Sequence, residues 1–512
     1  MPLFRSERGI GRGEIAESRI EAPFFAAFMV GCAILLLLAH LYFANNAVTI
    51  VLGISMVVFG TTVVRVDYGV YILVIAMLLS PEVFLGYAGD RPLNIRYDDV
   101  LIGVIFVGVL VKLSFEGKHA LWRPSPVNVG IVAYYGVCCV STLLALRANL
   151  PAWDKRSSFF VMLKMLEFYM VFVVVGDAIR TREEVRKQIT LFLTVGLVIC
   201  AYGLVTMRSG ERVTAPFESM EGTEPNTLGG YLMLVMSTTI GLYVYAPTRK
   251  LKTLFASLTV LAFVPFLYTL SRASYIALLA AMTTAGIFGR KLVILAVVAL
   301  ILILSPVLMP KEIMDRVNYT FQRGAGEPLK VAGRDTGLQV DKSTHERIYI
   351  WRKVSFILHV APWFGGGISW ESVMDSQYAR VILETGLFGL AAFLFLQWRL
   401  FRAAREAHRW SRDWLCRGIA LGSVAGTIGV IVHAMGTISF LIIRIMEPYW
   451  FLIALTIVAR SLAIEDYARR ARAARMASAP AQDAGDNAPR LPEALAPSRQ
   501  PGLVRTVQRQ PG

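Results

Sequence analysis

The sequence has few charged residues, few cysteines and none of the common ligand motifs. Only 17% of its 512 residues are charged and 55% are hydrophobic, whereas a soluble domain of this size needs far more polar surface. The five cysteines lie in or beside apolar runs, which excludes a disulfide framework. No CxxC, HExxH or acidic ligand cluster occurs, and the glycines at 365–367 are not set in a P-loop. We therefore expect no metal site and no cofactor.

Long apolar runs make up most of the chain. They recur from Phe24 to Ile464, are about 17–22 residues long, and can each cross a hydrocarbon core about 30 Å thick. Backbone amides in lipid must be satisfied internally, so these runs predict helices. We predict an all-α polytopic membrane protein with about 14 transmembrane helices, at residues 24–43, 46–64, 68–86, 98–114, 127–146, 158–176, 187–206, 227–246, 251–270, 273–288, 291–309, 377–398, 417–436 and 447–464.

The basic residues predict the orientation of this bundle. With residues 1–23 in the cytoplasm, the short connections on that side are rich in Lys and Arg, as the positive-inside rule requires. An even number of spans then returns residues 465–512 to the cytoplasm, where they form a basic and largely disordered tail. The two parts of the bundle, residues 24–309 and 377–464, flank one large periplasmic loop at 310–376, between spans 11 and 12.

The net charge of +16 follows from this orientation. The basic residues are spread over many connections and no nucleic-acid-binding motif accompanies them, so we expect no nucleic-acid partner. The tail is expected to be solvated and without a catalytic role, with contact between its arginines and anionic membrane lipid as the alternative.

Chemistry is expected in the long polar loop and at the ionisable residues of the spans. Arg347 and Arg352 are five residues apart and so lie on adjacent faces of a helix, although one of them could instead pair with Glu346. Lys164 and Glu167 are three apart, which predicts either an intramembrane ion pair or a lysine that holds an anionic headgroup. Arg272 ends a span, where it can snorkel or bind a phosphate.

Several segments resemble, in order, the superfamily of O-antigen ligases and polysaccharide polymerases. The resemblance covers roughly residues 96–396, and the matching segments are LKMLEFYMVFVVV, APFESMEGTEPNTLGGYLML, TLSRASYIALL, HERIYIWRKVSFILHVAPWFGGG and DSQYARVILETGLFGLAAF. It implies a GT-C-like membrane glycosyltransferase whose donor is a glycan on undecaprenyl pyrophosphate. It also implies inversion at the anomeric carbon and an active face on the periplasmic side of the bacterial inner membrane.

The resemblance also suggests the site residues. Arginines suit a pyrophosphate because the guanidinium fork matches paired phosphate oxygens, and stabilising negative charge is usually the largest catalytic contribution. The predicted catalytic residues are Arg272, Arg347, Arg352 and the general base Asp375, for which His345 is an alternative base and helix capping an alternative role. The predicted substrate-binding residues are Lys164, Arg212, Asn226, Glu384 and the sugar-stacking Trp351 and Trp363.

One departure from the family pattern separates two activities. At the start of the helix that re-enters the membrane, the ligases of this family typically have a His, whereas this chain has Asp375 followed by Ser376. This difference favours a polymerase of exopolysaccharide or O-antigen repeat units. The alternatives are an O-antigen ligase and, from a different class, a polysaccharide or solute transporter. A transporter should show related halves and broken helices at matching positions, and neither is visible. Candidate protein partners of a polymerase are a chain-length regulator and a flippase.

Overall fold

A computed structural model of the chain describes residues 46–80, 82–88, 91–115, 124–148, 155–207, 212–216, 225–308, 327–331, 334–340, 342–370 and 376–478. Within these ranges the chain forms fourteen α-helices, one 3-10 turn and two β-hairpins. The helices are α2 (Asn46–Val64), α3 (Val66–Leu79), α4 (Tyr97–Phe115), α5 (Asn128–Ala148), α6 (Lys155–Ala178), α7 (Arg182–Thr206), α8 (Pro225–Tyr245), α9 (Arg249–Leu267), α10 (Arg272–Gly289), α11 (Leu292–Leu308), α13 (Lys342–Val360), α14 (Gln377–Trp410), α15 (Trp414–His433) and α16 (Ile443–Ser478).

The helical membrane architecture predicted from the apolar runs is confirmed. Among the described residues, seven helices are long and apolar enough to cross a membrane, namely α5, α6, α7, α8, α9, α14 and α15. The chain is therefore a multi-pass membrane protein. The total of about 14 spans stays a prediction, as do the cytoplasmic termini, the periplasmic face and the organisation around a loop at 310–376.

The two antiparallel hairpins were not predicted. Strands β1 (Glu82–Ala88) and β2 (Arg91–Arg96) pair with each other, as do β3 (Glu327–Val331) and β4 (Arg334–Val340). Residues 82–86 were expected to continue the third span, but α3 ends at Leu79. The cause is local, because a proline follows Ser80 and disfavours helical geometry there, and Ser80 is extended with φ −78° and ψ 127°.

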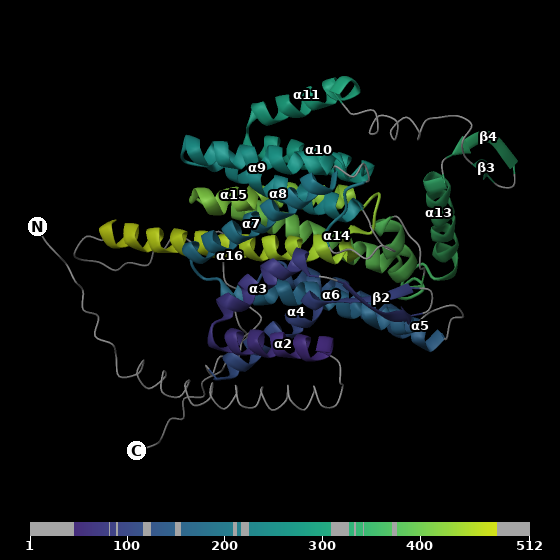
Figure 1. The fold of residues 1–512 in the computed structure, drawn as a ribbon, viewed down its shortest axis with the longest axis horizontal. Helices are drawn as coiled ribbons and strands as arrows, with labels where there is room; N and C mark the ends of the chain where they lie inside the picture. The colour runs from purple at the N-terminus through teal and green to yellow at the C-terminus, as the bar shows by residue number, and fades with distance from the viewer. Residues whose placement is uncertain are drawn as a thin grey trace, which may run out of the picture.

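Most of the helices lie side by side along one direction, and α13 runs across that direction at one end of the bundle (Figure 1). The hairpin β3–β4 and strand β2 lie at the same end (Figure 1). Helix α13 is amphipathic, and its residues Ile350, Val354 and Ile357 pack on the beginning of α14 at Ile382 and Leu383. This contact places a helix from the large polar insert directly over the ends of the bundle helices.

Helix α8 is the centre of the bundle, because almost all of its apolar residues are buried. It packs against α15, where Gly418, Gly422 and Gly426 are spaced four apart on one face. A Cβ on Gly422 would lie 2.7 Å from Thr238 Cα, and one on Gly241 would lie 2.3 Å from the Gly418 carbonyl oxygen. Small residues let the two backbones touch, which is how membrane helices gain packing energy without a hydrophobic driving force between them.

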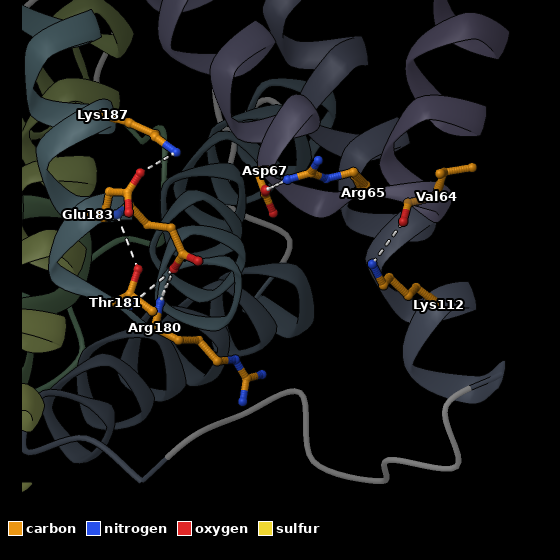
Figure 2. Close-up of polar contacts among 9 residues, drawn as sticks. Val64, Arg65, Asp67, Lys112, Arg180, Thr181, Glu183 and Lys187 are labelled. Atoms are coloured by element: carbon orange, nitrogen blue, oxygen red, sulfur yellow. Dashed lines mark hydrogen bonds and ion pairs between the residues drawn. The ribbon is translucent and has the colours of Figure 1, made fainter. Parts of the chain in front are cut away.

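The opposite end of the bundle carries short polar connections (Figure 2). Helix α7 begins with a capping box, in which the Thr181 side chain accepts from the Glu184 amide and the Glu184 carboxylate accepts from the Thr181 amide at 3.0 Å. Lys112 Nζ donates to the Val64 carbonyl oxygen at 3.1 Å, which satisfies the end of α2. These contacts, drawn in Figure 2, satisfy backbone groups at the helix ends and involve solvent-exposed side chains.

The α8–α15 contact leads to a stability prediction. Gly422→Ala should lower the free energy of unfolding by about 1–3 kcal/mol, because the added methyl must displace backbone of α8. Gly136→Ala on α5 is the matched control, since a Cβ there meets nothing within 4 Å. The control should melt at the same or a higher temperature, because alanine favours helix over glycine. Thermal melting of both purified variants in one detergent tests this, and equal melting temperatures would contradict the packing account.

Candidate functional site

Four helix ends meet beneath α13. The Gln377 amide at the start of α14 donates to the Ala434 carbonyl oxygen just after α15, at 3.1 Å. The start of α10 contacts the start of α8 through Ser271 and Asn226, whose side-chain oxygens are 2.6 Å apart. Since α13 packs on the beginning of α14, all of these ends belong to the α13 end of the bundle. Polar side chains from distant parts of the sequence are thereby brought together.

A continuous chain of hydrogen bonds links three of these helices. His433 lies between Ser439 and Ser274, with Nδ1 2.8 Å from Ser439 Oγ and Nε2 3.0 Å from Ser274 Oγ. Ser274 Oγ donates to Ser271 Oγ at 2.7 Å, and Ser271 Oγ donates to Asn226 Oδ1 at 2.6 Å. We name these five residues the Ser-His chain.

Each hydrogen bond in the Ser-His chain can be donated in only one direction. Each serine hydroxyl has a single proton, and those of Ser274 and Ser271 are directed toward Asn226. Ser274 must therefore accept from His433 Nε2–H, and His433 Nδ1 must accept from the Ser439 hydroxyl. His433 is fully buried and thus held as one neutral tautomer. The chain ends on the carbonyl oxygen of Asn226, so it fixes the orientation of that amide.

The local sequence explains how these groups reach one another. Ser271 is the N-cap of α10, and its hydroxyl accepts from the Ser274 amide at 3.2 Å. Ser274 faces Gly229 on α8, where a Cβ would lie only 2.2 Å from Ser274 Oγ. The Asn226-x-x-Gly229 spacing therefore places the amide and the gap for the serine on one face of α8.

Arg212, Asn226 and Arg272 are brought together at the start of α10. Arg212 donates from Nε to the Thr269 carbonyl oxygen and from Nη2 to the Leu270 carbonyl oxygen, both at 3.2 Å. These bonds hold a tight turn in which Leu270 has a positive φ of 51°. Arg272, the first residue of α10, is half-buried beside this turn. A helix start with an arginine is suited to bind an anion, because the first backbone N–H groups point outward.

Lys164 lies in a different cluster. The expected contact with Glu167 is present at 3.5 Å, and Lys164 Nζ also pairs with Asp99. Asp99 in turn accepts from the Arg96 amide at 2.9 Å. The structure therefore joins Lys164 to an ionic cluster between α4 and α6 and not to Arg272. A role in headgroup binding stays a prediction.

The same ionic cluster contains a carboxylate that the sequence did not reveal. Glu447 on α16 is fully buried, and one oxygen each of Glu447, Asp98 and Asp99 lie within 4.8 Å of one another. Arg96 pairs with Asp98 at 2.7 Å and Lys164 pairs with Asp99. Two cations thus already neutralise two of the three carboxylates, which favours an internal ion-pair network over a metal site.

Glu384 is engaged inside the protein. Its Oε1 accepts from Arg380 Nε at 2.9 Å and from the Ser369 amide at 2.9 Å, and both charged side chains are almost fully buried. Arg380 and Glu384 are four residues apart, so this ion pair lies within α14. The Gly366 and Gly367 amides donate to the carbonyl oxygens of Leu383 and Glu384, which fixes the glycine run against α14. Direct substrate binding by Glu384 stays a prediction.

The remaining predicted residues lie over this end of the bundle. Trp351 and Arg352 are exposed on the face of α13 turned away from α14. Trp363 is exposed and stacks on Phe388, with ring centroids 5.3 Å apart. Arg347 and His345 lie in α13, where only their backbone is described. Asp375 lies outside the described residues. The N-cap of α14 is Ser376, not the alternative Asp375.

Sequence reasoning missed His433, Ser274, Arg380 and Glu447. A signal existed for the three ionisable residues, since each interrupts an apolar run where a charge is costly to bury. Their partners could not be read in the same way. His433 meets Ser274 across 159 positions, and no sequence period joins them.

The buried Arg380–Glu384 pair yields a second prediction. Glu384→Ala should cost about 3–5 kcal/mol of unfolding free energy, because it leaves the Arg380 cation buried without its partner. Glu183→Ala is the matched control, since Glu183 and Lys187 form an exposed pair with the same spacing on α7. Chemical denaturation in detergent micelles should show no measurable change for the control. A Glu384→Ala protein as stable as the control would show that the buried pair contributes nothing.

Comparison with known proteins places part of this site in a family. Residues 257–394 match the family described as O-Antigen ligase. The match covers Arg272, Arg352 and Glu384 but not Lys164, Arg212 or Asn226. A search of curated proteins finds no match to the chain. Residues 257–394 are thus similar to the O-antigen ligase family, which supports the resemblance to the superfamily of O-antigen ligases and polymerases.

Proposed function

We propose that the protein polymerises oligosaccharide repeat units carried on undecaprenyl pyrophosphate, in exopolysaccharide or O-antigen synthesis. The family match supports a membrane glycosyltransferase of the ligase or polymerase type that acts on lipid-linked glycans. The observation that carries the proposal is the gathering of Arg212, Asn226 and Arg272 at the start of α10, at the end of the bundle on which α13 packs. Cations at a helix start at the end of a membrane bundle suit a lipid-linked pyrophosphate.

The proposed reaction is a single inverting displacement. A sugar hydroxyl of the acceptor attacks the anomeric carbon of the donor, and the bond from that carbon to the pyrophosphate oxygen breaks. Undecaprenyl pyrophosphate leaves with the bonding electrons, while the hydroxyl proton passes to a base. Arg272, with Arg347 and Arg352 of α13, would neutralise the leaving group, since guanidinium groups stay charged and bind phosphate oxygens in pairs.

The remaining roles are assigned from position. Asp375 is the proposed base because it immediately precedes Ser376, the N-cap of α14, and a carboxylate can serve when burial raises its pKa. Trp351 and Trp363 offer exposed aromatic faces for stacking on sugars. Lys164 is the proposed contact for an anionic headgroup. Glu384 is proposed to act on substrate through Arg380 and the glycine run.

The Ser-His chain supports this assignment as a positioning device. It joins α15, α10 and α8 through hydrogen bonds of 2.6–3.0 Å, and its last member is Asn226. The start of α10 is thereby fixed before any substrate arrives. Preorganised charge stabilises a transition state more than charge that must reorganise.

The alternatives differ in what they require. A ligase would transfer finished glycan to lipid A core, and Asp375 in place of the ligases' histidine favours the polymerase. A transporter would move lipid-linked units without making a bond, and no observation favours it.

The proposed location is the periplasmic side of the inner membrane, with a chain-length regulator and a flippase as candidate partners.

Arg272→Gln tests the proposal in cells that depend on this protein for polymer. Polymer formation should fall about 100-fold, because one preorganised charge at the leaving group is lost. Single repeat units on their lipid carrier should accumulate on the outer side of the inner membrane. Carbohydrate gels and extraction of lipid-linked oligosaccharides measure both effects.

Arg249→Gln is the matched control for this experiment. Arg249 is also the first residue of a helix, α9, but at the opposite end of the bundle, so polymer should be normal. Normal chains that fail to reach lipid A in Arg272→Gln would support a ligase instead. Repeat units trapped on the cytoplasmic side would point to a flippase. Equal polymer in both variants would remove Arg272 from the site.

A further inference from the structure

A basic cavity lies at the end of the bundle opposite α13. Its volume is about 760 Å³, and its walls come from the end of α8, the end of α10 with the turn into α11, the last turns of α14 and the start of α15. The other ends of α8, α10, α14 and α15 carry the Ser-His chain or lie beneath α13, which places the cavity a full helix length from the proposed catalytic residues. The proposed glycosyl transfer does not use it.

The walls of this cavity carry five cations and, among the lining residues, no carboxylate. The cations are Arg290, Lys291, Arg405, Arg409 and Arg417. Nearby acids of the described chain are engaged elsewhere: Glu406 pairs with Arg402 and Arg460, and the Asp413 side chain caps α15 by accepting from the Cys416 amide. A surplus of positive charge in a concave site attracts anions.

Aromatic rings hold two of the cations in place. The Arg417 guanidinium lies 4.6 Å over the Tyr245 ring, and the Arg405 guanidinium lies 5.6 Å over the Phe288 ring. The Tyr245 hydroxyl is 2.8 Å from His408 Nε2, which fixes that ring in turn. Arg417 Nε is buried and has no hydrogen-bond partner within the described residues.

The surroundings favour a lipid over a soluble anion. Val244, Ile287 and Phe288 give the cavity an apolar side, and Ile287 is 58% exposed. Leu292 and Val293, directly after the cavity, are 80% and 69% exposed. Since α8, α14 and α15 are membrane-spanning in length and composition, their ends mark the boundary between hydrocarbon and headgroups. Acyl chains can therefore lie on the apolar side while phosphate occupies the basic side.

We propose that this cavity binds the headgroup of an anionic phospholipid with two phosphates, of the diphosphatidylglycerol kind, from the leaflet at that end. Five cations exceed what one phosphate charge needs, and basic pockets between transmembrane helices are suited to headgroups with several charges. The lipid bridges α8, α10, α14 and α15, whose opposite ends hold the Ser-His chain and the glycine run.

The test uses the purified full-length protein, stripped of lipid in detergent. Tetraoleoyl diphosphatidylglycerol, dioleoyl phosphatidylglycerol and inorganic pyrophosphate are added separately, and binding is followed by native mass spectrometry and by the melting temperature. The wild type should retain one diphosphatidylglycerol and gain thermal stability from it. Affinity should fall about fivefold for each cation removed in the double variant Arg405→Gln and Arg409→Gln.

Two further variants separate binding from folding. Arg402→Gln with Arg412→Gln removes the same charge from α14 and the turn that follows it without touching the cavity, and should bind like the wild type. Arg290→Gly removes a cavity cation at a position with φ 53°, where glycine is favoured. Its melting temperature without lipid should be unchanged or higher, while its lipid affinity falls.

Three results would overturn the proposal. Equal lipid binding by the cavity variants and the Arg402/Arg412 control would show that the cavity is not the site. An equal thermal shift from inorganic pyrophosphate alone would indicate a soluble phosphate ligand. Equal affinity for phosphatidylglycerol and diphosphatidylglycerol would contradict recognition of two phosphates.

Discussion

The structure depends on one constraint, which is that polar groups within a membrane bundle must find their partners inside the protein. His433 is fully buried and is satisfied on both ring nitrogens by serines from two other segments. Arg380 and Glu384 are both buried, and Arg380 Nε donates to Glu384 Oε1. Because an unpaired group would cost several kcal/mol in hydrocarbon, these contacts fix how the helix ends meet. The position of Arg272 at the start of α10 follows from them.

The two ends of the bundle consequently have different chemistry. At the α13 end, buried hydrogen-bonded groups support a small number of cations and exposed aromatic faces, an arrangement suited to a lipid-linked glycan. At the opposite end five cations surround an open cavity, and two of them, Arg405 and Arg417, lie over aromatic rings. Glycine contacts between α8 and α15 connect the two ends through closely packed backbone. In the proposed orientation the reaction takes place outside, while the second lipid binds from the cytoplasmic leaflet.

The sequence predicted the bundle because hydrocarbon selects long apolar helices, a local property of the chain. Of the predicted site residues, Arg212, Asn226 and Arg272 lie together at the start of α10, and their roles stay predictions. The sequence could not predict His433, because the partner Ser274 lies 159 positions away. The hairpins were missed because the apolar residues 83–85 were included in the third predicted span, beyond the proline that follows Ser80. Asp375 remains a prediction, and the lysine expected at the site lies in the ionic cluster with Asp99.

The most direct test of the central claim is a reconstituted reaction with a single substrate. The purified protein in liposomes would receive only the undecaprenyl-pyrophosphate-linked repeat unit, and the products would be resolved by mass spectrometry. The account predicts glycans of two or more units, one undecaprenyl pyrophosphate released for each new glycosidic bond, and inversion at the joined anomeric carbon. Transfer that occurs only after lipid A core is added, or a new bond that retains the donor configuration, would contradict it.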